Sequence, residues 1–255
     1  MQIPDLQGKV ALVTGSSTGI GAAVATAFGQ QGMAVAVHCN RTRAEAEAVA
    51  AAIEAAGGRA IVLQGDVSDA ARQAELVEET VAAFGRLDIL VANAGSVVER
   101  KPIEQAGDDL YDQVMDLNAR SVFVAARAAI PHLRAAGGGS IISTTSLAAR
   151  NGGGGGSVLY AAAKGFVSSF TRGLAKEVAR DRIRVNAVAP GVIMTPLQER
   201  LTPAKQIEAA IRLTPMRRTG TTDECVGAYL YLASDALSGF VTGQVIEVNG
   251  GIIMP

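Results

Sequence analysis

The most constraining feature of this sequence is a regular alternation between short apolar runs and longer helical patterns. The apolar runs read as buried strands at residues 9–14, 33–38, 60–63, 87–92, 140–144, 184–189 and 244–248. Helical patterns lie between them at residues 20–31, 44–56, 69–84, 108–136, 159–180 and 222–234. Pro131 is expected to kink the long fourth helix. Apolar strands separated by helices are typical of a parallel sheet covered on both faces, so we expect an α/β fold.

Length, charge and cysteine content narrow the class further. The 255 residues contain no linker and no break in composition, so we expect residues 1–255 to form one domain. A net charge of −1 without a basic patch argues against nucleic acid or a membrane surface as a partner. No apolar run is long enough to span a membrane, and residues 1–5 do not begin a signal peptide. Cys39 and Cys225 lack metal or disulfide spacing, so we expect no metal, reduced thiols and a cytoplasmic location.

A glycine-rich turn, Thr14–Gly21, joins the first strand to the first helix. Glycine lets the backbone bend tightly and approach a ligand closely. The start of the following helix offers free N–H groups and the positive end of a dipole, which suits a pyrophosphate. The spacing is G-x-x-x-G-x-G instead of the commoner G-x-G-x-x-G, so the turn alone leaves a purely structural role open.

Tyr160 and Lys164 stand four residues apart in an expected helix, so their side chains leave the same face one turn apart. A free phenol has a pKa near 10 and is a poor acid at neutral pH. A fixed ammonium nearby favours the phenolate and lowers that pKa, so the tyrosine can exchange a proton at working pH. Taken alone, the spacing favours a surface tyrosine above a surface lysine, and the other motifs of the chain overturn that interpretation.

Four motifs together point to one family. They are the Thr14–Gly21 turn, the Asn93-Ala94-Gly95 step, the Tyr160-x-x-x-Lys164 pair and Pro190-Gly191. Their order and spacing resemble the short-chain dehydrogenase/reductase family in its single-domain form of about 250 residues, and the resemblance covers residues 9–251. It implies a doubly wound, Rossmann-type sheet of seven parallel strands in the order 3-2-1-4-5-6-7, with helices on both faces.

The resemblance also implies which residues bind a dinucleotide. Asp66 and Val67 match the adenine-contacting pair, although they also fit the start of a helix. Thr195 matches a residue that can hydrogen-bond the nicotinamide carboxamide. The full implied set is Gly15, Ser17, Thr18, Gly19, Ile20, Gly21, Asp66, Val67, Asn93, Ala94, Gly95, Tyr160, Lys164, Pro190, Gly191, Val192 and Thr195.

The end of the second strand indicates which nucleotide is preferred. Family members that prefer NAD usually carry an acidic residue here to hold the ribose 2′-hydroxyl, whereas this chain has Asn40, Arg41 and Thr42. Arg41 can pair with a 2′-phosphate, and Asn40 and Thr42 can donate hydrogen bonds to it. We therefore expect the protein to favour NADP(H) over NAD(H). The alternative is that Arg41 is only a solvent-exposed charge at the start of a helix.

The catalytic residues expected from the resemblance are Asn118, Ser146, Tyr160 and Lys164. Tyr160 is the proton donor, Lys164 also holds the nicotinamide ribose, and Ser146 polarises the substrate oxygen. Thr144 and Thr145 are fallback candidates for the serine. Asn118 matches the family asparagine that holds a water linking Lys164 to solvent, and it also fits a mid-helix asparagine bonded to its own backbone.

The expected substrate pocket consists of small, apolar or neutral residues: Ser96, Ser146, Leu147, Ala148, Tyr160, Gly191 and Val192, with residues 195–215 as a lid. A small neutral ketone or secondary alcohol suits these groups. An alternative is a 3-oxoacyl-[acyl-carrier-protein] reductase, although Pro131 and Asp181 occupy positions where basic residues dock the carrier. A non-catalytic dinucleotide sensor is a further alternative. The resemblance implies a homotetramer paired through the helices at 108–136 and 159–180.

Overall fold

The computed structural model describes residues 2–254, apart from the side chains of Leu197, Arg200 and Leu201. Its centre is a sheet of seven strands: β1 (Val10–Val13), β2 (Ala34–Cys39), β3 (Arg59–Gln64), β4 (Ile89–Ala92), β5 (Gly139–Thr144), β6 (Ile183–Pro190) and β7 (Val245–Val248). Every neighbouring pair is parallel, and the order is β3-β2-β1-β4-β5-β6-β7. The expected fold class and strand order are therefore confirmed.

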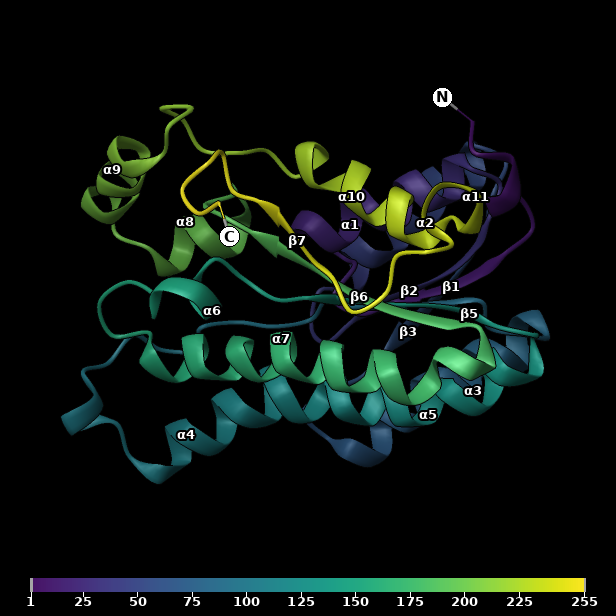
Figure 1. Ribbon diagram of the computed structural model, residues 1–255, viewed down its shortest axis with the longest axis horizontal. Coiled ribbons are helices and arrows are strands. Elements are labelled where there is room, and N and C mark those ends of the chain that lie inside the picture. Colours follow the sequence, from purple (N-terminus) through teal and green to yellow (C-terminus); the bar gives the residue numbers. More distant parts are fainter. Residues whose placement is uncertain (1, 255) are drawn as a thin grey trace.

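Helices cover both faces of the sheet (Figure 1). One layer holds α1 (Gly19–Gln30), α2 (Arg43–Ala55) and α10 (Asp223–Ala233), and the other holds α3 (Ala70–Phe84), α5 (Ser121–Ala135) and α7 (Val158–Val178). The central strands β1 and β4 are buried on both faces, which explains why they consist of apolar residues. Phe28 and Tyr229 fill the core on the first face, and Leu76 and Leu133 fill it on the second.

The helices differ from expectation in their number and bounds. Pro131 lies inside α5 near its C-terminal end, and the helix continues past it to Ala135. The hydrogen-bond pattern changes earlier, because the π-helical segment Asp116–Arg120 separates α4 (Asp108–Met115) from α5. The expected lid contains two short helices, α8 (Pro196–Leu201) and α9 (Ala204–Leu213). Two four-residue helices, α6 (Ala148–Asn151) and α11 (Asp235–Ser238), were also not expected.

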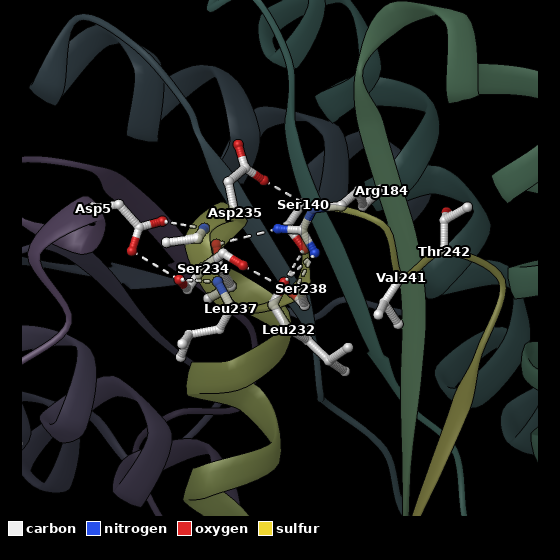
Figure 2. Close-up of polar contacts among 12 residues, drawn as sticks. Asp5, Ser140, Arg184, Leu232, Ser234, Asp235, Leu237, Ser238, Val241 and Thr242 are labelled. Atoms are coloured by element: carbon white, nitrogen blue, oxygen red, sulfur yellow. Dashed lines mark hydrogen bonds and ion pairs between the residues drawn. The ribbon is translucent and has the colours of Figure 1, made fainter.

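A buried arginine fastens the last helices to the sheet, at the end of the strands opposite the glycine turn (Figure 2). Arg184, near the start of β6, donates hydrogen bonds to the carbonyl oxygen of Leu232 at 2.7 Å and to Ser238 Oγ at 2.9 Å. It also pairs with Asp235 at 2.9 Å. α10 therefore ends against a fixed positive charge, which is favourable at the C-terminus of a helix. Within residues 2–254, no helix is long and apolar enough to cross a membrane.

Candidate active site

A cleft of about 800 Å³ lies at the carboxyl ends of β1, β4 and β5. Strand order reverses direction between β1 and β4, and ligands of doubly wound sheets bind at such a switch point. All the residues expected to form the site line this cleft except Asn118, Leu147, Ala148 and Val192. The fold thus brings together residues that the sequence spreads over 180 positions, from Gly15 to Thr195.

The glycine turn has the backbone geometry that a close ligand contact requires. Gly15 and Gly19 have φ angles of +64° and +60°, which side chains disfavour. A Cβ on Gly21 would lie 2.6 Å from Asn93 Nδ2, so no larger residue fits there. Asn93 donates hydrogen bonds to the carbonyl oxygens of Thr14 and Gly15 at 3.0 and 3.2 Å. The N-terminus of α1 therefore faces the cleft, and its free N–H groups suit the pyrophosphate of a dinucleotide.

His38, at the end of β2, supports this turn in a way that the sequence did not indicate. Its Nδ1 accepts a hydrogen bond from the Gly15 N–H at 2.9 Å, so its Nε2 donates to the Gly65 carbonyl oxygen at 3.0 Å. The ring is therefore neutral. Burial lowers its pKa, and Arg72 adds to that effect, while the bond to Gly65 and the charge of Asp66 oppose it. A neutral histidine thus links the first three strands below the cofactor end of the cleft.

We expect acid to destabilise this arrangement. Because the pKa of His38 is lower in the folded state, its contribution is fully present above the unfolded value of 6.5 and is lost as the pH falls below it. The loss is at most about 1.4 kcal/mol per pH unit for one group. Thermal unfolding at pH 7.5 and 5.5 tests this: His38→Gln should show a smaller change in Tm between the two pH values than the unsubstituted protein. An equal change would show that His38 does not titrate in this range.

The end of β2 presents neutral and basic groups to the cleft. Asn40 and Arg41 are exposed, and Thr42 Oγ1 lies 2.7 Å from Ser17 Oγ. Asp66 lies close to them, and its pKa is lowered by hydrogen bonds from Ser68 and Asn40 and by the charge of Arg41. Asp66 comes from the segment after β3, so it does not replace the missing acid at the end of β2.

The part of the cleft where proton transfer is expected contains Ser146, Tyr160 and Lys164. Ser146 follows β5, and its hydroxyl is hydrogen-bonded to that of Tyr160, near the start of α7. Lys164 lies one turn further along, 2 % exposed, with its Nζ 5.7 Å from the centre of the Tyr160 ring. Its ammonium donates a hydrogen bond to the Thr144 carbonyl oxygen at 2.7 Å. The three side chains therefore occupy the arrangement that the sequence predicts.

The pKa values refine the expected roles. Burial raises the pKa of Tyr160, and the hydrogen bond to Ser146 and the charge of Arg100 oppose that rise. Burial lowers the pKa of Lys164 to about 8, so its ammonium remains largely protonated at neutral pH. The phenol is thus protonated at neutral pH and able to donate. The sequence-based expectation that Lys164 lowers the phenol pKa is therefore corrected, because burial raises the pKa of Tyr160 and the groups that oppose the rise are Ser146 and Arg100.

The fallback residues have other contacts. Thr144 Oγ1 lies 2.7 Å from the Tyr229 hydroxyl and donates to Asn93 Oδ1. Thr145 Oγ1 donates to the Lys164 carbonyl oxygen at 2.8 Å, which fixes α7 against β5. Both hydroxyls thus have structural partners, and Ser146 is the hydroxyl that reaches Tyr160.

Asn118 lies outside the cleft and contacts the backbone beside it. Its Oδ1 accepts a hydrogen bond from the Ser96 N–H, and its Nδ2 donates to the carbonyl oxygens of Ser96 and Val114. A Cβ on Gly95 would lie 2.7 Å from Asn118 Oδ1 and 3.0 Å from Lys164 Nζ, so both groups converge on this glycine. Asn118 therefore makes the backbone contact to Val114 of a mid-helix asparagine and also fixes the end of β4 beside Lys164.

Three expected pocket residues lie elsewhere. Val192 lines a neighbouring cavity of about 210 Å³ together with Ile193, which lines the main cleft as well. Leu147 is buried, and its N–H donates to the Pro190 carbonyl oxygen. The N–H of Ala148 donates to Ser146 Oγ at 3.1 Å, so this residue orients the serine.

The fold and this site together define a nicotinamide-dinucleotide-dependent oxidoreductase. A family model described as enoyl-(acyl carrier protein) reductase matches residues 15–253. The chain is 42% identical to an uncharacterised oxidoreductase of Methylorubrum extorquens, over 97% of this chain and 98% of that one. The chain belongs to the short-chain dehydrogenase/reductase family, as its motifs predicted.

Other relatives carry more specific descriptions. A 3-oxoacyl-[acyl-carrier-protein] reductase of Synechocystis is 38% identical, with 98% of each chain covered. The solved structure of an NADH-dependent reductase, A1-R′, responsible for alginate metabolism superimposes with a TM-score of 0.91 at 39% identity, over 99% of this chain and 100% of that one. A short-chain dehydrogenase from Burkholderia cenocepacia in complex with NADP matches with a TM-score of 0.91 at 34% identity, over 97% and 99% of the two chains.

Proposed function

We propose that the protein reduces a small neutral ketone to a secondary alcohol, or runs the reverse reaction, with Tyr160 as the proton donor and acceptor. The observation that carries the proposal is the Ser146–Tyr160 hydrogen bond beside the buried Lys164 ammonium, inside a cleft that begins at a glycine turn. Ser96, Ser146 and Gly191 contribute neutral groups to the cleft, whose lining also includes Asp112 and Asp116. The bound cofactor supplies or accepts the hydride.

The residues of the chain then have distinct tasks. The hydroxyl of Ser146 donates a hydrogen bond to the substrate oxygen and polarises it. Tyr160 passes its phenolic proton to that oxygen as negative charge develops there. Lys164, charged at neutral pH, favours the phenolate that remains and holds the cofactor ribose. Cofactor oxidation with a panel of ketones tests the reaction. Cofactor binding without turnover of any ketone would favour a dinucleotide sensor instead.

The preferred cofactor is NADP(H) in this proposal. Its support is the exposed Arg41 at the rim of the cleft and the lack of an acidic residue at the end of β2. Solved relatives do not decide the matter, since one is described as NADH-dependent and another is complexed with NADP.

Arg41→Ala should lower the ratio of kcat/KM for NADPH to that for NADH by about 10- to 100-fold, the effect of one charge-assisted hydrogen bond to phosphate. Arg43→Ala is the matched control. Arg43 is an exposed arginine two residues away that pairs with Glu47 and does not line the cleft. A clear NADH preference of the unsubstituted protein, or equal changes in the two variants, would contradict the assignment.

A 3-oxoacyl-[acyl-carrier-protein] reductase is the second candidate, supported by the Synechocystis relative. One observation weakens it. Asp181, at an expected carrier-docking position, pairs with Arg134 at 2.6 Å, which removes a positive charge from that surface. Comparing a 3-oxoacyl group on the carrier protein with the same group on a small thiol distinguishes the two, because only a carrier-dependent enzyme prefers the former.

We further propose a cytoplasmic homotetramer paired through α4–α5 and α7. These helices lie side by side on one face of the molecule (Figure 1). They expose Phe123 at 40 % and Phe166 at 39 %, and both rings pack on Phe170. Light scattering should give about four times the chain mass of 26.1 kDa. Phe166→Glu should lower that mass by at least half, whereas Phe240→Glu, an exposed phenylalanine outside these helices, tests whether charge alone has this effect.

A further inference from the structure

Arg100 connects three segments around the mouth of the cleft. It lies on the loop between β4 and α4, which the sequence analysis left without a role. Its Nη1 donates to the carbonyl oxygen of Gly155 at 3.3 Å, in the glycine loop at residues 152–156. Its Nη2 donates to Thr202 Oγ1 at 3.1 Å, between the two lid helices. One guanidinium therefore joins the β4–α4 loop, the glycine loop and the lid.

The backbone around Arg100 is built to hold this position. The N–H of Lys101 donates to the Gly156 carbonyl oxygen at 2.9 Å. A Cβ on Gly156, whose φ is +72°, would lie 2.7 Å from the Lys101 nitrogen, so only glycine allows the two loops to approach this closely. Val98 has a φ of +65°, which is rare for a β-branched residue. Strain of this kind persists only where the surrounding structure imposes it.

The charge of Arg100 reaches Tyr160. It lowers the pKa of the phenol, after the larger effect of the Ser146 hydrogen bond, while burial raises it. Lys164 on α7 and Tyr229 on α10 also act near the phenol, and the carboxylates of Asp112 on α4 and Asp116 line the same cleft. α4 packs against Tyr160 with apolar side chains.

The loop that carries Arg100 also holds one opposing pair of charges. Glu99 and Lys101 are 3.4 Å apart and offset each other. Arg100 lowers the pKa of Tyr160 by its charge, and Lys164 places a second cation 5.7 Å from the centre of the Tyr160 ring.

We propose that Arg100 is a positioning residue of the reaction, which fastens the lid to the glycine loop and holds a second positive charge near Tyr160. The inference rests on the proposed function for the role of Tyr160. It adds that closure of the substrate pocket and activation of the phenol depend on the same side chain. A lid fastened over the site also excludes water from the reacting groups.

The test is a titration of the Tyr160 phenol that needs no turnover. The chain has four tyrosines and no tryptophan, so phenolate absorbance is readily followed. Each protein is titrated in the presence of saturating oxidised cofactor. The titration curve of Tyr160→Phe is then subtracted, which leaves the contribution of Tyr160. Arg100→Met should raise the apparent pKa of Tyr160 by about half a unit to one unit. The pH dependence of alcohol oxidation should shift in the same direction.

Two matched variants separate charge from attachment. Arg100→Lys keeps the charge but not the two-pronged contact, so it should largely restore the Tyr160 titration while the KM for substrate stays high. Thr202→Val removes only the lid contact. It should raise KM by about threefold to tenfold, the effect of one hydrogen bond, without shifting the titration.

An unshifted titration in Arg100→Met would overturn the role of the charge, and an unchanged KM in Thr202→Val would overturn the attachment. If Arg100→Met does not fold, Arg100→Gln takes its place. A shifted titration in a protein that turns over no ketone would leave this inference standing and refute the proposed function alone.

Discussion

Tyr160→Phe is expected to lower kcat for ketone reduction by about a thousandfold while leaving cofactor affinity within about threefold of its original value. The substitution removes one hydroxyl, the group that Ser146 contacts and that faces the cleft, and it keeps the ring that packs against Leu110 and Val114. Because the phenol is the proposed proton donor, the loss should fall on kcat more than on KM. Stopped-time assays of NADPH oxidation and fluorescence titration of NADPH separate the two quantities.

Tyr111→Phe is the matched control, because Tyr111 is half exposed on α4 and lies outside the cleft. It should retain full activity. Equal turnover in the Tyr160 variant and the unsubstituted protein would remove Tyr160 from its role. The pH profile adds a second check. Reduction needs a protonated phenol and a charged Lys164, whose pKa is about 8, so kcat should decline as the pH rises through that value.

The fold was predictable because its signal is local. Strands of a parallel sheet that are buried on both faces are rich in apolar residues, and β1, β2 and β6 carry enough of them that their boundaries fall within one residue of the expected ones. The lid helices α8 and α9 were not expected, because prolines flank a polar segment whose helical turns pack little apolar surface. The π-helical segment at Asp116–Arg120 has no local signal, since Asn118 reaches across to Ser96, 22 residues away.

The site was predictable where its residues form motifs and not where contacts depend on tertiary structure. Tyr160 and Lys164 lie on one helix turn, so spacing places them together. The contacts of Arg100 span 55 and 102 residues, and the bond from Gly15 to His38 spans 23. No spacing rule covers such separations. Nor does the motif that contains Val192 indicate that this residue lines the neighbouring cavity.

The largest expected loss of stability comes from a residue outside the site. Arg184→Met should lower the free energy of unfolding by about 3–5 kcal/mol, the usual result of breaking a buried charged network. The Arg184 side chain is 8 % exposed, and it donates to the carbonyl oxygens of Leu232 and Ala233 and to Ser238 Oγ. The two carbonyls belong to the last turn of α10, where no intrahelical donor is available (Figure 2). Methionine fills the space but leaves the Ala233 carbonyl oxygen without its donor, and the Leu232 carbonyl oxygen keeps only the hydrogen bond from Ser140 Oγ at 2.9 Å.

Asp235→Asn separates the ion pair from the carbonyl contacts. The Asp235 side chain is 63 % exposed, so its pairing with Arg184 should contribute less than about 1 kcal/mol. Urea denaturation with equal m values measures both variants. Similar small losses of unfolding free energy in Arg184→Met and Asp235→Asn would mean that the hydrogen bonds from Arg184 to the α10 carbonyls contribute little to stability. Because Arg184 lies near the start of β6 and the cleft surrounds the carboxyl ends of the strands, folded Arg184→Met should keep its kcat. A lowered kcat would instead mean that the packing of α10, which carries Tyr229 against Thr144, is transmitted to the catalytic residues.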